Sequence, residues 1–163
     1  RDGKGSTWEG GMRVPGIFWW PGKIGPGAVR RQVASTMDLF ATLHRLAGVE
    51  LPSGRTLDSH DLSPLLFADG ASTRQSLFYY RGQRLMAVRH GPWKAHLFTQ
   101  PAYGPGSRTA TPHDPPLLYN LDEDPSEQYD VAQQHADVVE AIRAAIAVHL
   151  AGLKPAPSQL ENP

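Results

Sequence analysis

The sequence contains no cysteine, so disulfide bonds, thiolate metal ligands and a cysteine nucleophile are excluded within these 163 residues. Neither sign of charge is in excess, because 16 Lys and Arg balance 16 Asp and Glu. The chain therefore lacks the basic patch that is typical of proteins that bind nucleic acid. No apolar run approaches the roughly 18 residues of a membrane-spanning helix. We accordingly expect neither nucleic acid nor a membrane as a partner.

The sequence does contain enough apolar residues for a folded core, since hydrophobic residues make up 40% of it. Residues 1–13 are rich in glycine and predict a loop with tight turns. Residues 14–20 form a nearly continuous apolar and aromatic run, which predicts a short strand buried on both faces, as in a parallel sheet.

Two helices are predicted. Residues 35–47 have Ser35 as a plausible N-cap, Asp38 in the position of a capping box, one apolar face and a terminal Gly48. A closing helix is predicted over residues 137–153 from its apolar residues at helical spacing. Between these helices, the chain predicts a connection with one short helical turn, followed by a small sheet.

The small sheet is predicted from four short segments rich in aromatic or aliphatic residues and separated by Gly or Pro. These segments cover residues 76–81, 85–89, 94–99 and 117–120. Gly91-Pro92 predicts a tight hairpin between the second and the third. Residues 100–116 are rich in proline and lack periodicity, so they predict a long loop of the kind that often carries function.

Five segments occur in an order and spacing that resemble a known family. They read GKGSTWEGGMRVP from residue 3, WWPGKI from 19, MDLFATLHRLAG from 37, FYYRGQRLMAVRHGPWKAHLFTQ from 78 and PPLLYNLDEDPSEQYDV from 115. Together they resemble the C-terminal part of type I sulfatases, in the branch that contains N-acetylgalactosamine-6-sulfatase and arylsulfatase A. One such segment alone would be weak evidence, whereas five in order are specific.

The resemblance implies an α/β fold of the alkaline-phosphatase-like type. Residues 1–70 are then expected to be the last part of the large α/β catalytic domain. Residues 71–163 are expected to form a smaller α+β domain with about four antiparallel strands and a C-terminal helix.

The resemblance also implies two cofactors for the intact enzyme. Sulfatases of this family use a formylglycine, made from Cys or Ser in a Cys/Ser-x-Pro-x-Arg motif, and a calcium ion held by Asp and Asn. Neither this motif nor the family's metal ligands occur in this sequence, so no metal-binding residue is assigned here. We therefore expect a C-terminal portion that is inactive alone and needs the missing N-terminal portion of the enzyme as a partner.

Lys4 is the residue to which the resemblance assigns chemistry, because the Lys of this segment contacts the substrate sulfate in the family. A fixed ammonium group stabilises negative charge that develops on sulfate oxygens. Glu9 and Arg13 are expected to shape the loop that presents Lys4. Four further residues are predicted to contact the substrate from the small domain: His96, Tyr103, Arg108 and His113.

Two alternative functions remain open at the level of the sequence. The first is a phosphonate or phosphate monoester hydrolase of the same superfamily. The second is a non-catalytic glycan-binding module, against which the Gly-Lys-Gly segment argues. The resemblance implies a periplasmic, secreted or lysosomal-type location, and the oligomeric state stays open.

Overall fold

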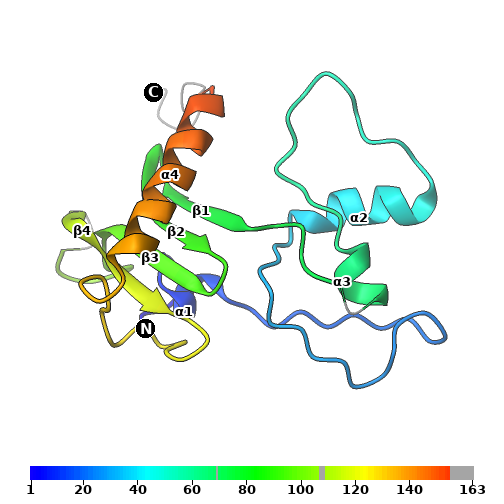
Figure 1. Ribbon diagram of the computed structural model, residues 1–163, viewed down its shortest axis with the longest axis horizontal. Helices are drawn as coiled ribbons and strands as arrows, with labels where there is room; N and C mark the ends of the chain where they lie inside the picture. The colour runs from blue at the N-terminus through cyan, green and yellow to red at the C-terminus, as the bar shows by residue number, and fades with distance from the viewer. Residues whose placement is uncertain (69, 107–108, 155–163) are drawn as a thin grey trace. The chain divides into compact units, whose positions relative to one another are not determined.

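The computed structural model describes residues 1–68, 70–106 and 109–154 (Figure 1). The chain forms two compact units, which are described separately. Unit 1 combines residues 1–14 with the chain from Ser76 onward, and unit 2 contains residues 15–75. The first residues of the sequence therefore pack with its second half. The division of the whole protein into domains near residue 70 stays a prediction.

Unit 1 is built on a four-stranded antiparallel sheet in the order β1-β2-β3-β4. Its strands are β1 (Ser76–Arg81), β2 (Arg84–His90), β3 (Trp93–Thr99) and β4 (Thr111–Asn120). Gly91 has a φ of 56°, which suits the first central position of the two-residue hairpin between β2 and β3. The small antiparallel sheet and its tight hairpin are thus confirmed.

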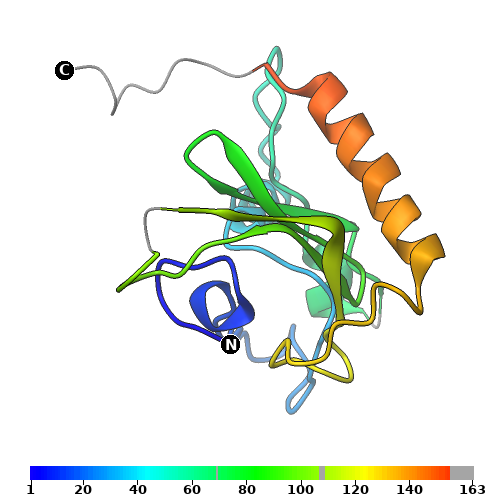
Figure 2. The same ribbon diagram turned by 90° about the vertical axis from the view of Figure 1, so that its left-hand side faces the viewer.

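Helix α4 (Ala136–Gly152) covers one face of this sheet (Figure 2). The core beneath it combines alternate strand residues with two helix residues: Val88, Ala95, Leu118, Val139 and Ile142. Near the end of the helix, the His149 ring stacks on Phe78 at 3.8 Å between centroids. The predicted closing helix and its role in packing on the sheet are confirmed.

The N-terminal segment, with the short helix α1 (Glu9–Met12), lies on the other face of the sheet (Figure 2). Successive strand residues point to opposite faces. Lys94 and His96 of β3 therefore face this segment, whereas Ala95 faces α4. None of the helices in the described part of the chain is long and apolar enough to cross a membrane.

Unit 2 contains helix α2 (Asp38–Ala47) and the short helix α3 (Ser63–Phe67). Half of the predicted capping box is present, because the Ser35 N–H donates to Asp38 Oδ2 at 2.8 Å. The Ser35 hydroxyl instead accepts from the Met37 N–H at 3.2 Å, and the helix begins at Asp38, after a turn over residues 36–37, and not at Ser35. Gly48, with a φ of 66°, ends α2 as predicted.

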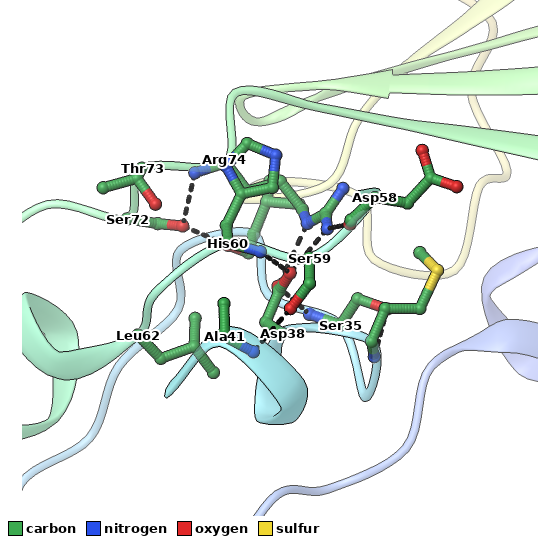
Figure 3. Close-up of polar contacts among 12 residues, drawn as sticks. Ser35, Asp38, Ala41, Asp58, Ser59, His60, Leu62, Ser72, Thr73 and Arg74 are labelled. Carbon is green, nitrogen blue, oxygen red and sulfur yellow. Dashed lines mark hydrogen bonds and ion pairs between the residues drawn. The ribbon is translucent and has the colours of Figure 1, made fainter. Parts of the chain in front are cut away.

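Arg74 forms a bidentate ion pair with Asp38, in which its Nε and Nη2 each donate to one carboxylate oxygen (Figure 3). Arg74 Nε donates to Oδ2 at 3.0 Å, and the His60 N–H donates to Oδ1 at 2.9 Å. Burial alone would raise the pKa of Asp38, but the hydrogen bond from Arg74 and those from two backbone N–H groups outweigh it and hold that pKa below its usual value. This contact joins α2 to two later segments of unit 2.

Two expectations about secondary structure are wrong. Residues 14–20 form no strand, and Ile17 and Trp19 are 91% and 84% exposed. A buried strand needs hydrogen-bonding neighbours, and none of the described residues pairs with this segment. The predicted helix α2 is present, and its apolar face is exposed within the described chain, including Leu43 at 61%.

The predicted loop over residues 100–116 is too long, because β4 already begins at Thr111. Pro112 pairs with Phe98 of β3, and two further prolines follow in the same strand. β4 lies at the edge of the sheet, where a residue without an N–H is tolerated because one side of the strand has no partner. Proline here marks an edge strand and not a loop.

Candidate functional site

Lys4 lies at an exposed turn in the N-terminal segment of unit 1. The Ser6 N–H donates to the Gly3 carbonyl at 3.1 Å, which closes a four-residue turn with Lys4 and Gly5 at its centre. Gly5 has a φ of 95°, which a side chain at this position of the turn would oppose. The Gly-Lys-Gly sequence thus presents the ammonium group at the tip of a tight turn.

The turn is held against α1 by two glycines. A Cβ atom on Gly11 would lie 2.6 Å from the Gly3 carbonyl oxygen and 2.5 Å from that of Ser6. A Cβ atom on Gly10 would lie 2.8 Å from the Arg1 carbonyl oxygen. Real Cβ atoms do not approach the backbone so closely. The loop that carries Lys4 can therefore lie this near to α1 only because residues 10 and 11 are glycines.

Helix α1 is in turn joined to the sheet by four buried polar residues, which we call the charge cluster: Glu9, Lys94, His96 and Glu127. Lys94 Nζ lies 2.8 Å from Glu9 Oε1 and 3.2 Å from Glu127 Oε1. Glu127 also accepts from His96 Nε2 at 2.7 Å and from the Glu9 N–H at 2.6 Å. The Glu127 carboxylate thus has two hydrogen-bond donors and the Lys94 ammonium group beside it, and the Glu9 carboxylate accepts from Lys94, so both buried charges are paired.

The protonation states in the charge cluster follow from these contacts. Burial lowers the pKa of His96, and the opposing hydrogen bond to Glu127 does not cancel that effect, so the ring is neutral at pH 7. Burial would raise the pKa of Glu127, but the hydrogen bond from His96 and the charge of Lys94 outweigh it and hold that pKa below its usual value. His96 therefore donates from Nε2, while Nδ1 is a buried acceptor without a hydrogen-bond partner in the described chain.

Further cations and aromatic rings surround the charge cluster. Arg89 and Arg13 each place Nη1 at 3.9 Å from Glu9 Oε2, which helps to balance two carboxylates against one ammonium group. Lys94 Nζ lies 4.8 Å from the centre of the Tyr79 ring, and Trp8 packs on His96 at 4.1 Å between centroids. The cluster is thus closed off from solvent on the side of α1.

The loop that follows β3 lies beside the Lys4 turn. The Ala102 N–H donates to Asp2 Oδ2 at 3.4 Å, and a Cβ atom on Gly5 would lie 3.4 Å from Ala102 Cβ and 3.9 Å from the Tyr103 hydroxyl. Tyr103 itself is 73% exposed. The structure therefore brings Lys4 and Tyr103, which are far apart in the sequence, to one exposed region of unit 1.

The other predicted substrate contacts lie differently. His113 is half-buried in β4, where its Nε2 lies 2.8 Å from Thr99 Oγ1 at the base of the same loop. His96 is buried in the charge cluster, and this placement supports a structural role better than a direct contact. Arg108 lies outside the described residues. The roles of these residues toward a substrate stay predictions.

Sequence reasoning missed Lys94 and Glu127 as members of a site. A signal was present, because Lys94 and His96 are two positions apart in a predicted strand and so face the same side. Glu127 had no comparable signal, since it lies in a polar turn. Among the described residues, no group of three or more His, Cys, Asp or Glu side chains could hold a metal ion.

Comparisons with known proteins identify the family. Residues 72–163 match the family described as the C-terminal region of aryl-sulfatase, and residues 1–49 match the sulfatase family. The chain is 46% identical to arylsulfatase A of Homo sapiens, over 88% of this chain and 31% of that protein. It is 42% identical to steryl-sulfatase of Mus musculus, over 98% of this chain and 29% of that protein.

The chain is also similar to a member of the sulfatase branch expected from the sequence and to a solved sulfatase structure. Identity to N-acetylgalactosamine-6-sulfatase of Canis lupus familiaris is 37%, over 97% of this chain and 34% of that protein. The crystal structure of a sulfatase from Pseudoalteromonas sp. matches with a TM-score of 0.82 at 32% identity, over 93% of this chain and 32% of that chain.

The chain belongs to the sulfatase family. Its four-stranded antiparallel sheet and C-terminal helix are those of the sulfatase C-terminal subdomain. It spans about a third of the length of the relatives that it matches.

Proposed function

We propose that the protein of which this chain forms a part hydrolyses sulfate esters, and that Lys4 contacts the sulfate group. The observation that carries the proposal is the placement of Lys4 at an exposed, glycine-flanked turn that is anchored to a buried charge cluster. A rigid base for the turn favours a fixed position of the ammonium group, which electrostatic stabilisation of a transition state requires.

The cofactors of the reaction are not assigned to this chain. The sequence contains neither Cys nor a Ser-x-Pro-x-Arg motif from which formylglycine is made, and among its described residues no group of three or more His, Cys, Asp or Glu side chains could hold a metal ion. We propose that the family's formylglycine and calcium ion act in the whole enzyme through residues outside this sequence. This chain then contributes the charge of Lys4 and part of the substrate cleft.

The remaining predicted contacts are proposed to act on the part of the substrate beyond the sulfate. Tyr103 is exposed beside the Lys4 turn, and His113 lies at the base of the same loop. Arg108 belongs to that loop in the sequence. His96 is proposed to act indirectly, through Trp8 and Glu127, because it is buried. An aryl sulfate or a sulfated sugar is the proposed substrate class.

The test uses the full-length protein with an aryl sulfate and the matching aryl phosphate and aryl phosphonate. We expect hydrolysis of the sulfate ester to be fastest, and Lys4→Ala to lower its kcat/KM by about 10²–10³-fold, as for loss of one donor to a developing anion. Lys23→Ala, at an exposed lysine of unit 2, is the matched control and should retain activity. Faster phosphate or phosphonate hydrolysis would favour the related hydrolase, and glycan binding without hydrolysis would favour the binding module.

A further inference from the structure

Both ends of the segment that carries Lys4 are attached to one residue, Glu127. At the start of the segment, Arg1 Nη1 donates to the Glu127 carbonyl oxygen at 3.2 Å. At its end, the Glu9 N–H donates to Glu127 Oε2 at 2.6 Å. Lys4 lies between these two anchors, so the segment forms a loop that is closed on the backbone and the side chain of the same residue.

The side chain of Glu127 is held from a second direction by the sheet. It accepts from His96 at 2.7 Å and lies 3.2 Å from Lys94, and all three side chains are buried. Lys94 also reaches Glu9 at 2.8 Å, so it ties the start of α1 to the same point. The position of α1 on the sheet therefore depends on charge pairing and not on apolar packing alone.

Glu127 has a backbone conformation that ordinary residues avoid. Its φ is 54°, in the left-handed region, which residues other than glycine rarely adopt. Such a conformation persists when its surroundings hold it in place, and it is found often at functional sites. Burial of ion pairs is also a weak source of net stability, so this cluster is not explained by stability alone.

We propose that Glu127 and Lys94 are positioning residues that hold Lys4 in place for the sulfate ester hydrolysis proposed above. They act through Glu9 and helix α1. Gly10 and Gly11 of this helix lie directly against the loop that carries Lys4. The inference rests on that proposed function, because a position of Lys4 matters only if Lys4 contacts the substrate. Neither Glu127 nor Lys94 touches the substrate, because both side chains are buried.

The test is a double-mutant cycle in the full-length protein between Glu127→Gln and Lys4→Ala. Gln retains an acceptor for the Glu9 N–H but removes the charge that faces Lys94. Because a displacement of about 1 Å can cost on the order of 10²-fold in rate, we expect Glu127→Gln to lower kcat/KM by about 10- to 100-fold when Lys4 is present. When Lys4 is Ala, the same change should have little further effect, since the group that it positions is gone.

A purely structural role predicts a different result, namely the same fold-loss with and without Lys4, accompanied by a lower melting temperature in both. That result would overturn the inference while leaving the role of Lys4 intact. A Lys4→Ala enzyme with normal activity would instead overturn the proposed function. Glu140→Gln, at an exposed glutamate of α4, is the matched control and should lower kcat/KM in neither background.

A second variant keeps the test decisive if Glu127→Gln does not fold. Arg1→Met removes the other anchor at an exposed position, where loss of fold is not expected. It should lower kcat/KM, by less than Glu127→Gln, and its effect should also disappear in the Lys4→Ala background. If Arg1→Met folds and its loss is equal in both backgrounds, or absent, the inference is wrong.

Discussion

Lys94 and Glu9 are 85 positions apart in the sequence, yet Lys94 Nζ donates to Glu9 Oε1 at 2.8 Å and neither side chain is open to solvent. The contact joins the second β-hairpin of the sheet to the helix that follows the Lys4 turn. It makes the position of a surface lysine depend on a buried ion pair on the face of the sheet opposite α4.

Replacement of Lys94 by Met should destabilise the protein. The change leaves the carboxylates of Glu9 and Glu127 buried without their shared cation, and breaking a buried pair by removal of one partner costs about 3–5 kcal/mol. Urea unfolding followed by tryptophan fluorescence measures the loss, with Lys23→Met at an exposed lysine as the control. Additional replacement of Glu9 by Gln should recover part of the stability, and no recovery would argue against an electrostatic origin.

Gly11→Ala should displace the Lys4 turn. The new Cβ atom would meet the backbone carbonyl oxygens of Ser6 and Gly3 at 2.5 and 2.6 Å, so the loop must move. We expect a loss of sulfate ester hydrolysis that exceeds the loss of melting temperature. Gly152→Ala, in α4 with nothing within 4 Å of the new Cβ, is the control and should leave both unchanged or raise stability by about 0.4–1 kcal/mol. Full activity of Gly11→Ala would show that the turn tolerates displacement.

Asp38 should make stability depend on pH in the acidic range. Because its pKa in the folded protein is held below the unfolded value of about 3.8, the ionised carboxylate stabilises the fold above that value. This contribution is lost as the pH falls through 3.8 toward the lower folded pKa. Asp38→Asn should therefore be less stable at pH 7 and should lose less melting temperature than the wild type between pH 6 and pH 3.

Asp122→Asn, at an exposed aspartate of unit 1, serves as the control for that experiment and should follow the wild type. If the melting temperatures of the wild type and Asp38→Asn fall in parallel with pH, protonation of Asp38 and loss of its contact with Arg74 are not the cause of the lower stability in acid.

Replacement of residues 101–106 by a Gly-Ser segment of equal length should change substrate preference. The loop lies beside the Lys4 turn through Ala102, and it presents the exposed ring of Tyr103. Binding residues are often carried on such loops, which a rigid scaffold holds in place. We expect activity on a small aryl sulfate to survive while the ratio of kcat/KM between sulfated sugars shifts. Unchanged ratios on every substrate would show that the loop takes no part in specificity.

Local signals in the sequence predicted the elements that depend on neighbouring residues. Gly48 predicted the end of α2, and Gly91-Pro92 predicted the hairpin between β2 and β3. Ser35 and Asp38 predicted the start of α2 to within three residues. The same signals misjudged residues 111–116, because proline is compatible with an edge strand and the sequence does not say which strand is at the edge.

The apolar run at residues 14–20 failed for a related reason. Its composition is that of a buried strand, but a strand forms only when neighbouring strands supply hydrogen bonds. In the described chain Trp19 is 84% exposed and the segment is irregular. The composition of residues 14–20 therefore indicated that they could form a buried strand, but in this structure they form an irregular, exposed segment.

The sequence by itself determined the family, the four strands of the small sheet, both long helices and the glycine-flanked turn that carries Lys4. Each of these depends on residue order, spacing or local hydrogen bonding, which a linear pattern records. Only the tertiary structure decided that Glu127 holds both ends of the Lys4 segment and that Lys94 is buried between two carboxylates. Such contacts arise when remote segments meet on one face of a sheet, and their energies depend on burial and distance, which no local pattern contains.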